Sequence, residues 1–106
     1  MPTSEEGRLL AKLTPGDGRK IVTTAGTREA LATTLEVNGL VITAETDNTG
    51  VIVVGGDTVV AVLATRQGAP LFAGDALPMG VVDLAEVYLD STVSGDGVTY
   101  LYLRKA

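Results

Sequence analysis

The stretch DNTGVIVVGG, residues 47–56, joins a polar turn, a run of β-branched residues and a double glycine. All four residues of the run 51–54 branch at Cβ, which favours a β-strand because such side chains pack well on a pleated surface. A strand with one face in water alternates polar and apolar residues, but this run is apolar throughout. We therefore expect residues 51–54 to form a strand covered on both faces, either by its own domain or by another chain.

Turn signals separate further short apolar runs on both sides of this stretch. Asn38-Gly39 is typical of a hairpin turn, and Pro78 predicts that the run around it is an edge strand or an irregular one. In the last run both alternating sets are substantially apolar, which predicts a central or interfacial strand. The expected strands and apolar runs cover residues 20–25, 28–36, 40–44, 51–54, 59–63, 71–72, 77–82, 87–90 and 98–103.

This spacing of strands and turns predicts an all-β fold, a small β-sandwich or jelly-roll-like barrel, as one domain over residues 19–106. Residues 1–18 differ, because a polar start leads to leucines at helical spacing and then to Pro-Gly-Asp-Gly. We expect an extended N-terminal arm that is either a frayed terminus or a basic segment docking on an acidic neighbouring surface. The predicted contact residues of the arm are Arg8, Leu9, Leu10, Lys12 and Leu13.

The composition argues against several classes of function. The chain has no histidine and no cysteine, which removes Ser–His and Cys–His nucleophiles and His- or Cys-ligated metals. A formal net charge of −5 argues against a nucleic-acid-binding surface, which needs a basic stripe. No run of about 18 apolar residues is present to span a membrane. We expect no catalytic residues and no cofactor.

Acidic and aromatic side chains are the remaining candidates for a site. Aspartates in or beside turns are expected to accept local backbone N–H groups, with convergence on a calcium ion as the alternative. The tyrosines either pack on the core with their hydroxyl groups at its rim or form a contact between subunits. The turn aspartates are Asp47, Asp57, Asp75, Asp83, Asp90 and Asp96, and the tyrosines are Tyr88, Tyr100 and Tyr102.

The stretch VDLAEVYLDSTVSGDGVTYLY, residues 82–102, resembles the C-terminal part of small virion proteins of tailed bacteriophages. Those proteins end in D-L-x-x-V-Y-V-D-x-x-V-x-G-(D/E)-G-V-x-Y-L-Y. Residues 47–56 resemble their motif D-N-T-G-x-I-Y-V-G-G, with Val53 where the pattern prefers tyrosine, and residues 71–75 resemble their L-x-(P/A)-G-(D/E) turn. The resemblance keeps the order of the three motifs, covers residues 28–103 and leaves the arm outside.

The resemblance implies a structural module on the virion, without catalysis. We expect a capsid decoration (cement) protein that assembles as a trimer on the capsid surface and clamps neighbouring major capsid proteins. The alternatives are a head-fibre, tail-associated or other minor virion protein. A carbohydrate-binding module for host attachment is a further alternative, although it would need exposed aromatic side chains and only four residues are aromatic.

Overall fold

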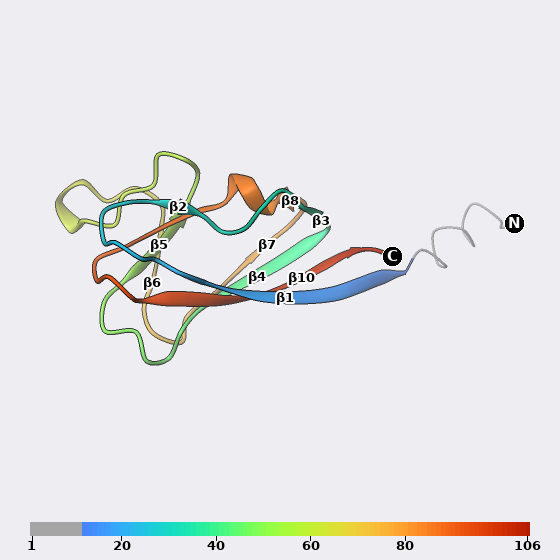
Figure 1. Cartoon of the computed structure of the whole chain (residues 1–106), viewed down its shortest axis with the longest axis horizontal. Helices are drawn as coiled ribbons and strands as arrows, with labels where there is room; N and C mark the ends of the chain where they lie inside the picture. Colours follow the sequence, from blue (N-terminus) through green and yellow to red (C-terminus); the bar gives the residue numbers. More distant parts are fainter. Residues whose placement is uncertain (1–11) are drawn as a thin grey trace, which may run out of the picture.

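The computed structural model describes residues 12–106, which form an all-β fold of antiparallel strands and two short 3-10 helices (Figure 1). The strands are β1 (Leu13–Ile21), β2 (Glu29–Ala30), β3 (Glu36–Val37), β4 (Gly39–Ala44), β5 (Ile52–Gly55), β6 (Ala69–Leu71), β7 (Ala76–Met79), β8 (Val82–Asp83), β9 (Tyr88–Ser91) and β10 (Gly97–Lys105); the helices are η1 (Leu63–Thr65) and η2 (Leu84–Glu86). No helix among these residues is long and apolar enough to cross a membrane.

Two four-stranded sheets form the sandwich. The larger has the order β1-β10-β4-β7, the smaller has the order β2-β9-β5-β6, and β3 and β8 pair separately. In the larger sheet, β1 pairs with β10 along its whole length, so the start of β1 lies beside the C-terminus (Figure 1). The prediction that the last strand is central is confirmed, because β10 lies between β1 and β4. The prediction that Pro78 lies on an edge strand is also confirmed, because β7 is the other edge.

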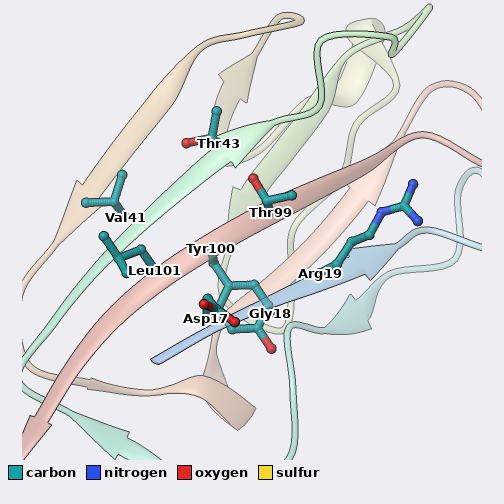
Figure 2. Close-up of a pocket in the computed structure, with 8 residues that line it drawn as sticks. All are labelled: Asp17, Gly18, Arg19, Val41, Thr43, Thr99, Tyr100 and Leu101. Carbon is teal, nitrogen blue, oxygen red and sulfur yellow. The ribbon is translucent and has the colours of Figure 1, made fainter. Parts of the chain in front are cut away.

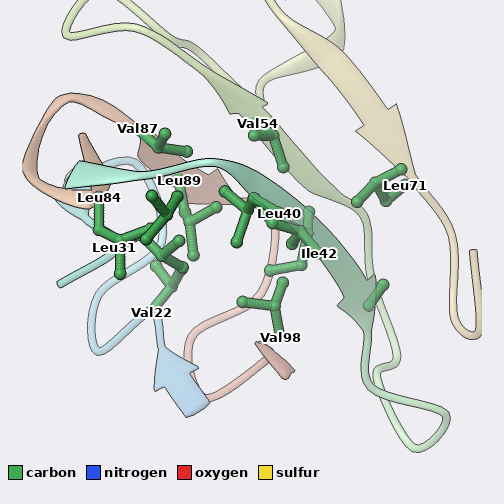
Figure 3. Packing of buried hydrophobic residues seen from close by; sticks show 13 residues of the cluster. Val22, Leu31, Leu40, Ile42, Val54, Leu71, Leu84, Val87, Leu89 and Val98 are labelled. Atoms are coloured by element: carbon green, nitrogen blue, oxygen red, sulfur yellow. The ribbon is translucent and has the colours of Figure 1, made fainter. Parts of the chain in front are cut away.

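One apolar core fills the space between the two sheets, and it recruits side chains from both sheets and from the connecting loops (Figure 3). Strand β4 contributes every second residue to this core, because its residues alternate between half-buried and buried, as expected of a strand with one inward face. The core residues are Val22, Leu31, Val37, Leu40, Ile42, Ala44, Ile52, Val54, Leu71, Leu84, Val87, Leu89 and Val98.

The apolar run after Asn48 is covered on both faces by its own chain. Ile52 and Val54 in β5 point into the main core, while Val53 points to the opposite face of the sheet. There Val53 packs in a second, smaller cluster with Val59 and Ala61, which belong to the loop that follows β5. The predicted two-sided burial is confirmed, and the second layer comes from the same chain.

The first strand begins earlier than predicted. A strand over residues 20–25 is wrong, because β1 covers residues 13–21 and crosses the boundary predicted at residue 18 between arm and domain. Pro-Gly-Asp-Gly is extended here rather than turned. The side chains of Tyr102 and Tyr100 lie across Gly16 and Gly18. A Cβ would be only 2.3 Å from Cζ of Tyr102 at Gly16 and 2.3 Å from the hydroxyl oxygen of Tyr100 at Gly18. The tyrosines on β10 therefore supply the packing that these glycines lack.

Two other local predictions are wrong. Asn38-Gly39 is not a hairpin turn, since β3 pairs with β8 while β4 pairs with β10 and β7. Asn38 instead marks where the chain passes between sheets, and its N–H donates to the carbonyl of Leu103 at 2.7 Å. A continuous strand over residues 28–36 is also wrong, because only its two ends belong to strands. Leu31 and Leu35 are drawn into the core instead.

Candidate binding surface

The outward-facing side chains of the larger sheet form a mainly apolar surface, which we call the outer face. The cross-strand register places Leu101 of β10 between Asp17 of β1 and Val41 of β4, and Val41 beside Pro78 of β7. One step along β10, Leu103 lies between Pro15 and Gly39. Leu13 begins the same row of outward residues on β1. Because cross-strand partners share a face, these apolar residues are contiguous.

This outer face is accessible. Leu101 is 51% exposed, Leu103 39% and Leu13 43%. Val41, Leu101, Thr43 and Thr99 line a shallow depression over β4 and β10 (Figure 2). Exposed apolar side chains that lie singly need no explanation, but a contiguous row of them on one sheet marks a surface suited to contact with another molecule.

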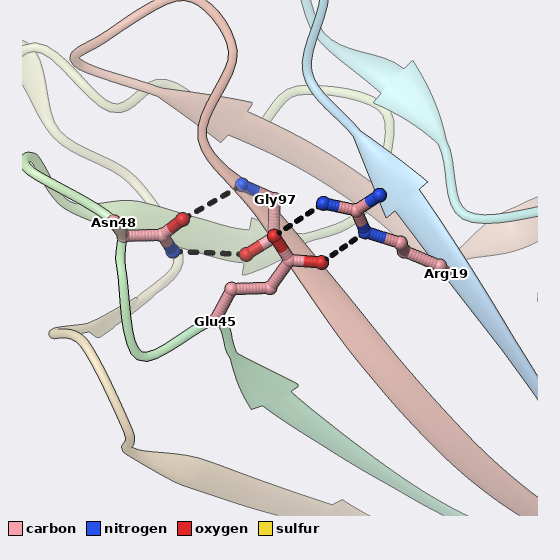
Figure 4. A network of polar contacts seen from close by, with 4 residues as sticks. All are labelled: Arg19, Glu45, Asn48 and Gly97. Carbon is pink, nitrogen blue, oxygen red and sulfur yellow. Dashed lines mark hydrogen bonds and ion pairs between the residues drawn. The ribbon is translucent and has the colours of Figure 1, made fainter.

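An ion pair between Arg19 and Glu45 lies at one end of the outer face. Arg19 in β1 donates through Nε to Oε2 of Glu45 and through Nη2 to Oε1 at 3.0 Å (Figure 4). The hydrogen bond and charge of Arg19 hold the pKa of Glu45 below its usual value, and the same hydrogen bond raises the pKa of Arg19. The guanidinium stays accessible, with 62% of the side chain exposed, whereas that of Glu45 is only 11% exposed. Arg19 can therefore still meet a second acidic group.

The turn aspartates hold the fold together. Asp90 and Asp96 are buried and accept several backbone N–H groups each, while Asp75 and Asp83 accept N–H groups in nearby turns. The predicted acceptance of local backbone N–H groups is confirmed for Asp75, Asp83 and Asp90. For Asp96 it is wrong, because Asp96 accepts N–H groups of the distant DNTG turn. For the exposed Asp47 and Asp57 it stays a prediction. Among residues 12–106 no group of three or more acidic side chains is arranged to hold a metal ion.

Two of the resemblance motifs meet in space, a feature that neither motif predicts by itself. The side chain of Asn48 donates to the Gly97 carbonyl and accepts from the Gly97 N–H, each at 2.9 Å (Figure 4). Asp96 accepts the N–H groups of Thr49 and Gly50 at 3.2 and 2.7 Å. The DNTG turn and the SGDG turn are thus bound to each other, so both motifs serve the fold.

The predicted arm residues are only partly described. Arg8, Leu9 and Leu10 lie outside the described residues. Lys12 and Leu13 are exposed, and Leu13 is the first residue of β1, opposite Lys105 of β10. The described part of the predicted contact therefore adjoins the outer face.

The three tyrosines are not brought together. The rings of Tyr100 and Tyr102 stack with centroids 6.3 Å apart, and both side chains pack partly buried against the main core. Burial raises the pKa of Tyr100. Tyr88 lies in the other sheet, beside the smaller cluster of Val53, Val59 and Ala61. The role of the tyrosines in a subunit contact stays a prediction.

Leu101 and Leu103 were not predicted as contact residues. The alternation along residues 98–103 separates them from the tyrosines, but alternation alone does not say which of two apolar faces is inside. The surface they form offers apolar contact area bordered along β1 by the charged side chains of Asp17 and Arg19. The described residues that line it are suited to contact with another molecule. No family model, curated protein or solved structure matches the chain.

Proposed function

We propose that the protein is a capsid decoration (cement) protein of a tailed phage, bound to the outer surface of the head. The observation that carries the proposal is the contiguous, exposed apolar outer face of the β1-β10-β4-β7 sheet. A surface of this kind suits a protein that acts by contact. The resemblance of residues 28–103 to small virion proteins supports the proposal that this contact is made on the capsid surface.

In this proposal the outer face and the arm bind the major capsid protein together. Lys12 and Leu13 lead directly into β1, whose outward side chains belong to the outer face. Burial of apolar area contributes roughly 25 cal/mol per Å² before the entropic cost of association is subtracted. A modest contact becomes strong when it is repeated over many copies on one particle.

The proposal includes a homotrimer, the state expected above for a decoration protein. Tyr88 is the tyrosine best placed for a subunit contact, because it lines a shallow depression with Gly56, Asp57 and Glu86. Tyr100 and Tyr102 cover the glycines of β1 on the inner side of the sheet. Because both side chains are partly buried, only the exposed part of each would be available for a subunit contact.

Replacing Leu101 with glutamine tests the outer face. We expect the affinity for undecorated heads to fall about tenfold or more, because an apolar side chain at the centre of the contact is replaced by one that loses hydrogen bonds to water on docking. The measurement is the number of copies that co-sediment with heads across a protein titration. The matched control is Leu63→Gln, since Leu63 is 77% exposed in η1, away from this sheet. Equal binding by both variants would remove the outer face from the proposal.

Deleting residues 2–11 tests the arm without entering β1. We expect binding to undecorated heads to weaken by about tenfold or more, because the deletion removes the predicted contact residues Arg8, Leu9 and Leu10. A parallel thermal melt checks that the domain still folds. Undiminished binding of the shortened chain would discard the arm as a capsid contact.

A further inference from the structure

The free edge of β1 differs from the other sheet edges among the described residues. β1 is a nine-residue strand at the edge of its sheet. The edges at β7 and β6 are four and three residues long and carry Pro78 and Pro70, and β2 has only two residues. Short edge strands and prolines protect a sheet from pairing with another chain. β1 carries Pro15 near its start, but it is too long to be protected in this way along its whole edge.

Two hydrogen bonds show which backbone groups face this edge. The N–H of Ala106 donates to the carbonyl of Lys12, and the N–H of Val22 donates to that of Asp96. Antiparallel strands alternate between hydrogen-bonded and non-hydrogen-bonded pairs, so the even-numbered residues of β1 bond to β10. The odd-numbered residues therefore turn their backbone groups to the open edge, and of these only Pro15 lacks an N–H.

We propose that β1 pairs edge to edge with β1 of a second copy of this chain, antiparallel about a two-fold axis at Gly18. In this register Asp17 lies opposite the partner's Arg19, and Arg19 lies opposite the partner's Asp17. Both are hydrogen-bonded pairs, since both use the outward backbone groups. Ile21 lies opposite the partner's Pro15, and its N–H donates to the Pro15 carbonyl. The missing N–H of proline therefore removes a hydrogen bond only from the outermost residue pairs.

The charges select this register over its neighbours. An axis at Asp17 would place two aspartates opposite each other, and an axis at Arg19 would place two arginines opposite each other, which is destabilising. An axis at Gly16 would place Pro15 in both central residue pairs, and each of these pairs would then lack one backbone hydrogen bond. The axis at Gly18 is the one that combines opposite charges with complete central hydrogen bonding.

The side chains at the edge allow the approach. Asp17 and Arg19 are alternate residues of β1 and both belong to the outer face. Glu45 uses Nε and Nη2 of Arg19 and leaves Nη1 to donate to an incoming carboxylate (Figure 4). On the inner face, Gly18 has no side chain and its space is filled by the ring of Tyr100. The contact joins two β1-β10-β4-β7 sheets into one and makes their outer faces continuous.

This contact goes beyond the proposed function, because it is two-fold and needs no capsid. The test uses the full chain alone, by sedimentation equilibrium over a range of concentrations at about 0.15 M salt, where only long-range charge effects are screened. We expect the wild-type chain to show a two-fold association step. Asp17→Lys and Arg19→Glu, each alone, should weaken that step by about tenfold or more, because each places like charges opposite each other twice.

An equimolar mixture of the two variants is the decisive sample. In a mixed pair, Lys at position 17 meets Glu at position 19, and the unchanged Arg19 meets the unchanged Asp17, so both contacts are complementary again. We expect the mixture to regain an association constant within about threefold of wild type. Glu36→Lys makes the same kind of charge change at an exposed residue of β3, outside both proposed contacts. Glu45→Gln breaks the internal ion pair without altering the edge. Both controls should associate as wild type does.

Three results would overturn the edge pairing. They are a wild-type chain with no two-fold step at any concentration, single variants that associate as wild type does, and a mixture that associates no better than its components. A wild-type trimer with no two-fold step would overturn this inference while leaving the proposed capsid function intact. Loss of head binding in Leu101→Gln has no bearing on it, so the two proposals fail separately.

Discussion

Replacing Asp90 with asparagine is expected to lower the free energy of unfolding by about 3 kcal/mol, because hydrogen bonds to a buried charged group are each worth about 1.5–3 kcal/mol. The side chain is only 2% exposed. One oxygen, Oδ1, accepts the N–H groups of Gly26 and Ser91 at 2.9 and 2.8 Å, and Oδ2 accepts that of Ala61 at 2.9 Å. An asparagine has one acceptor oxygen and would turn an NH₂ group toward a donor.

The position of Asp90 explains why the loss should be felt across the domain. Asp90 lies in β9 opposite Val53 of β5, on the face of the smaller sheet that the loop after β5 covers. Its carboxylate joins that loop, through Ala61, to the β1–β2 connection, through Gly26. We expect the second hydrophobic cluster to loosen when these bonds are lost.

Thermal and urea unfolding followed by circular dichroism measure the effect. A loss of this size lowers the Tm of a domain of this length by on the order of 15 °C. The matched control is Asp57→Asn, an exposed turn residue for which we expect a change below about 0.5 kcal/mol. Equal stability of the two variants would show that the Asp90 carboxylate does not hold the loop.

The parts of the fold that could be predicted from the sequence are those fixed by local pattern. The uniformly apolar run 51–54 indicated two-sided burial, and Pro78 indicated an edge, because each property follows from the residue types themselves. The two apolar faces of residues 98–103 indicated a central strand for the same reason. All three predictions concern how much of a strand is covered.

The parts that failed depend on partners distant in the sequence. Residues 15–18, Pro-Gly-Asp-Gly, are typical of a turn, but pairing with β10 and the rings of Tyr100 and Tyr102 holds them extended. Asn38-Gly39 is typical of a hairpin, but its flanking strands belong to different sheets. Turn propensity is a local preference that long-range pairing overrides.

The sequence predicted which residues of the candidate surface lie on one face of the last strand, but not whether that face points outward. Alternation placed Leu101 and Leu103 together, opposite the tyrosines, and the structure places them outward. Which set faces the core is decided by the opposing sheet, whose presence no local pattern reports. The same limit applies to the edge of β1, since the pairing of Asp17 with Arg19 can be considered only once the described residues are seen to leave the other side of that strand unpaired.

Replacing Asp96 with alanine is expected to lower the free energy of unfolding by about 2 kcal/mol, since two partly buried backbone N–H groups lose a charged acceptor. Asp96 is 6% exposed and binds Thr49 and Gly50 in the loop that passes from β4 to β5. Asp96 itself lies in the loop that passes from β9 to β10. In both loops the chain passes from one sheet to the other. The Asp96 carboxylate therefore holds these two connections together.

Asn48, in the loop between β4 and β5, bonds to Gly97, which follows Asp96 and begins β10. The two neighbouring links make Asn48 and Asp96 suitable for a double-mutant cycle. Asn48→Ala removes both bonds to Gly97 and is expected to cost about 1–2 kcal/mol. Once one link is lost the loops separate more easily, so the double variant should cost less than the sum of the single variants by about 0.5–1 kcal/mol. Urea unfolding of the four proteins gives the coupling directly.

Asp47→Ala is the control, because Asp47 lies in the same DNTG turn but is exposed, and its removal should change stability by less than about 0.5 kcal/mol. Additive losses at Asn48 and Asp96 would mean that the two motifs stabilise their own turns independently. A coupling of the expected sign would instead mean that DNTG (residues 47–50) and SGDG (residues 94–97) stabilise the domain as one unit. That unit would join the two loops in which the chain passes from one sheet to the other.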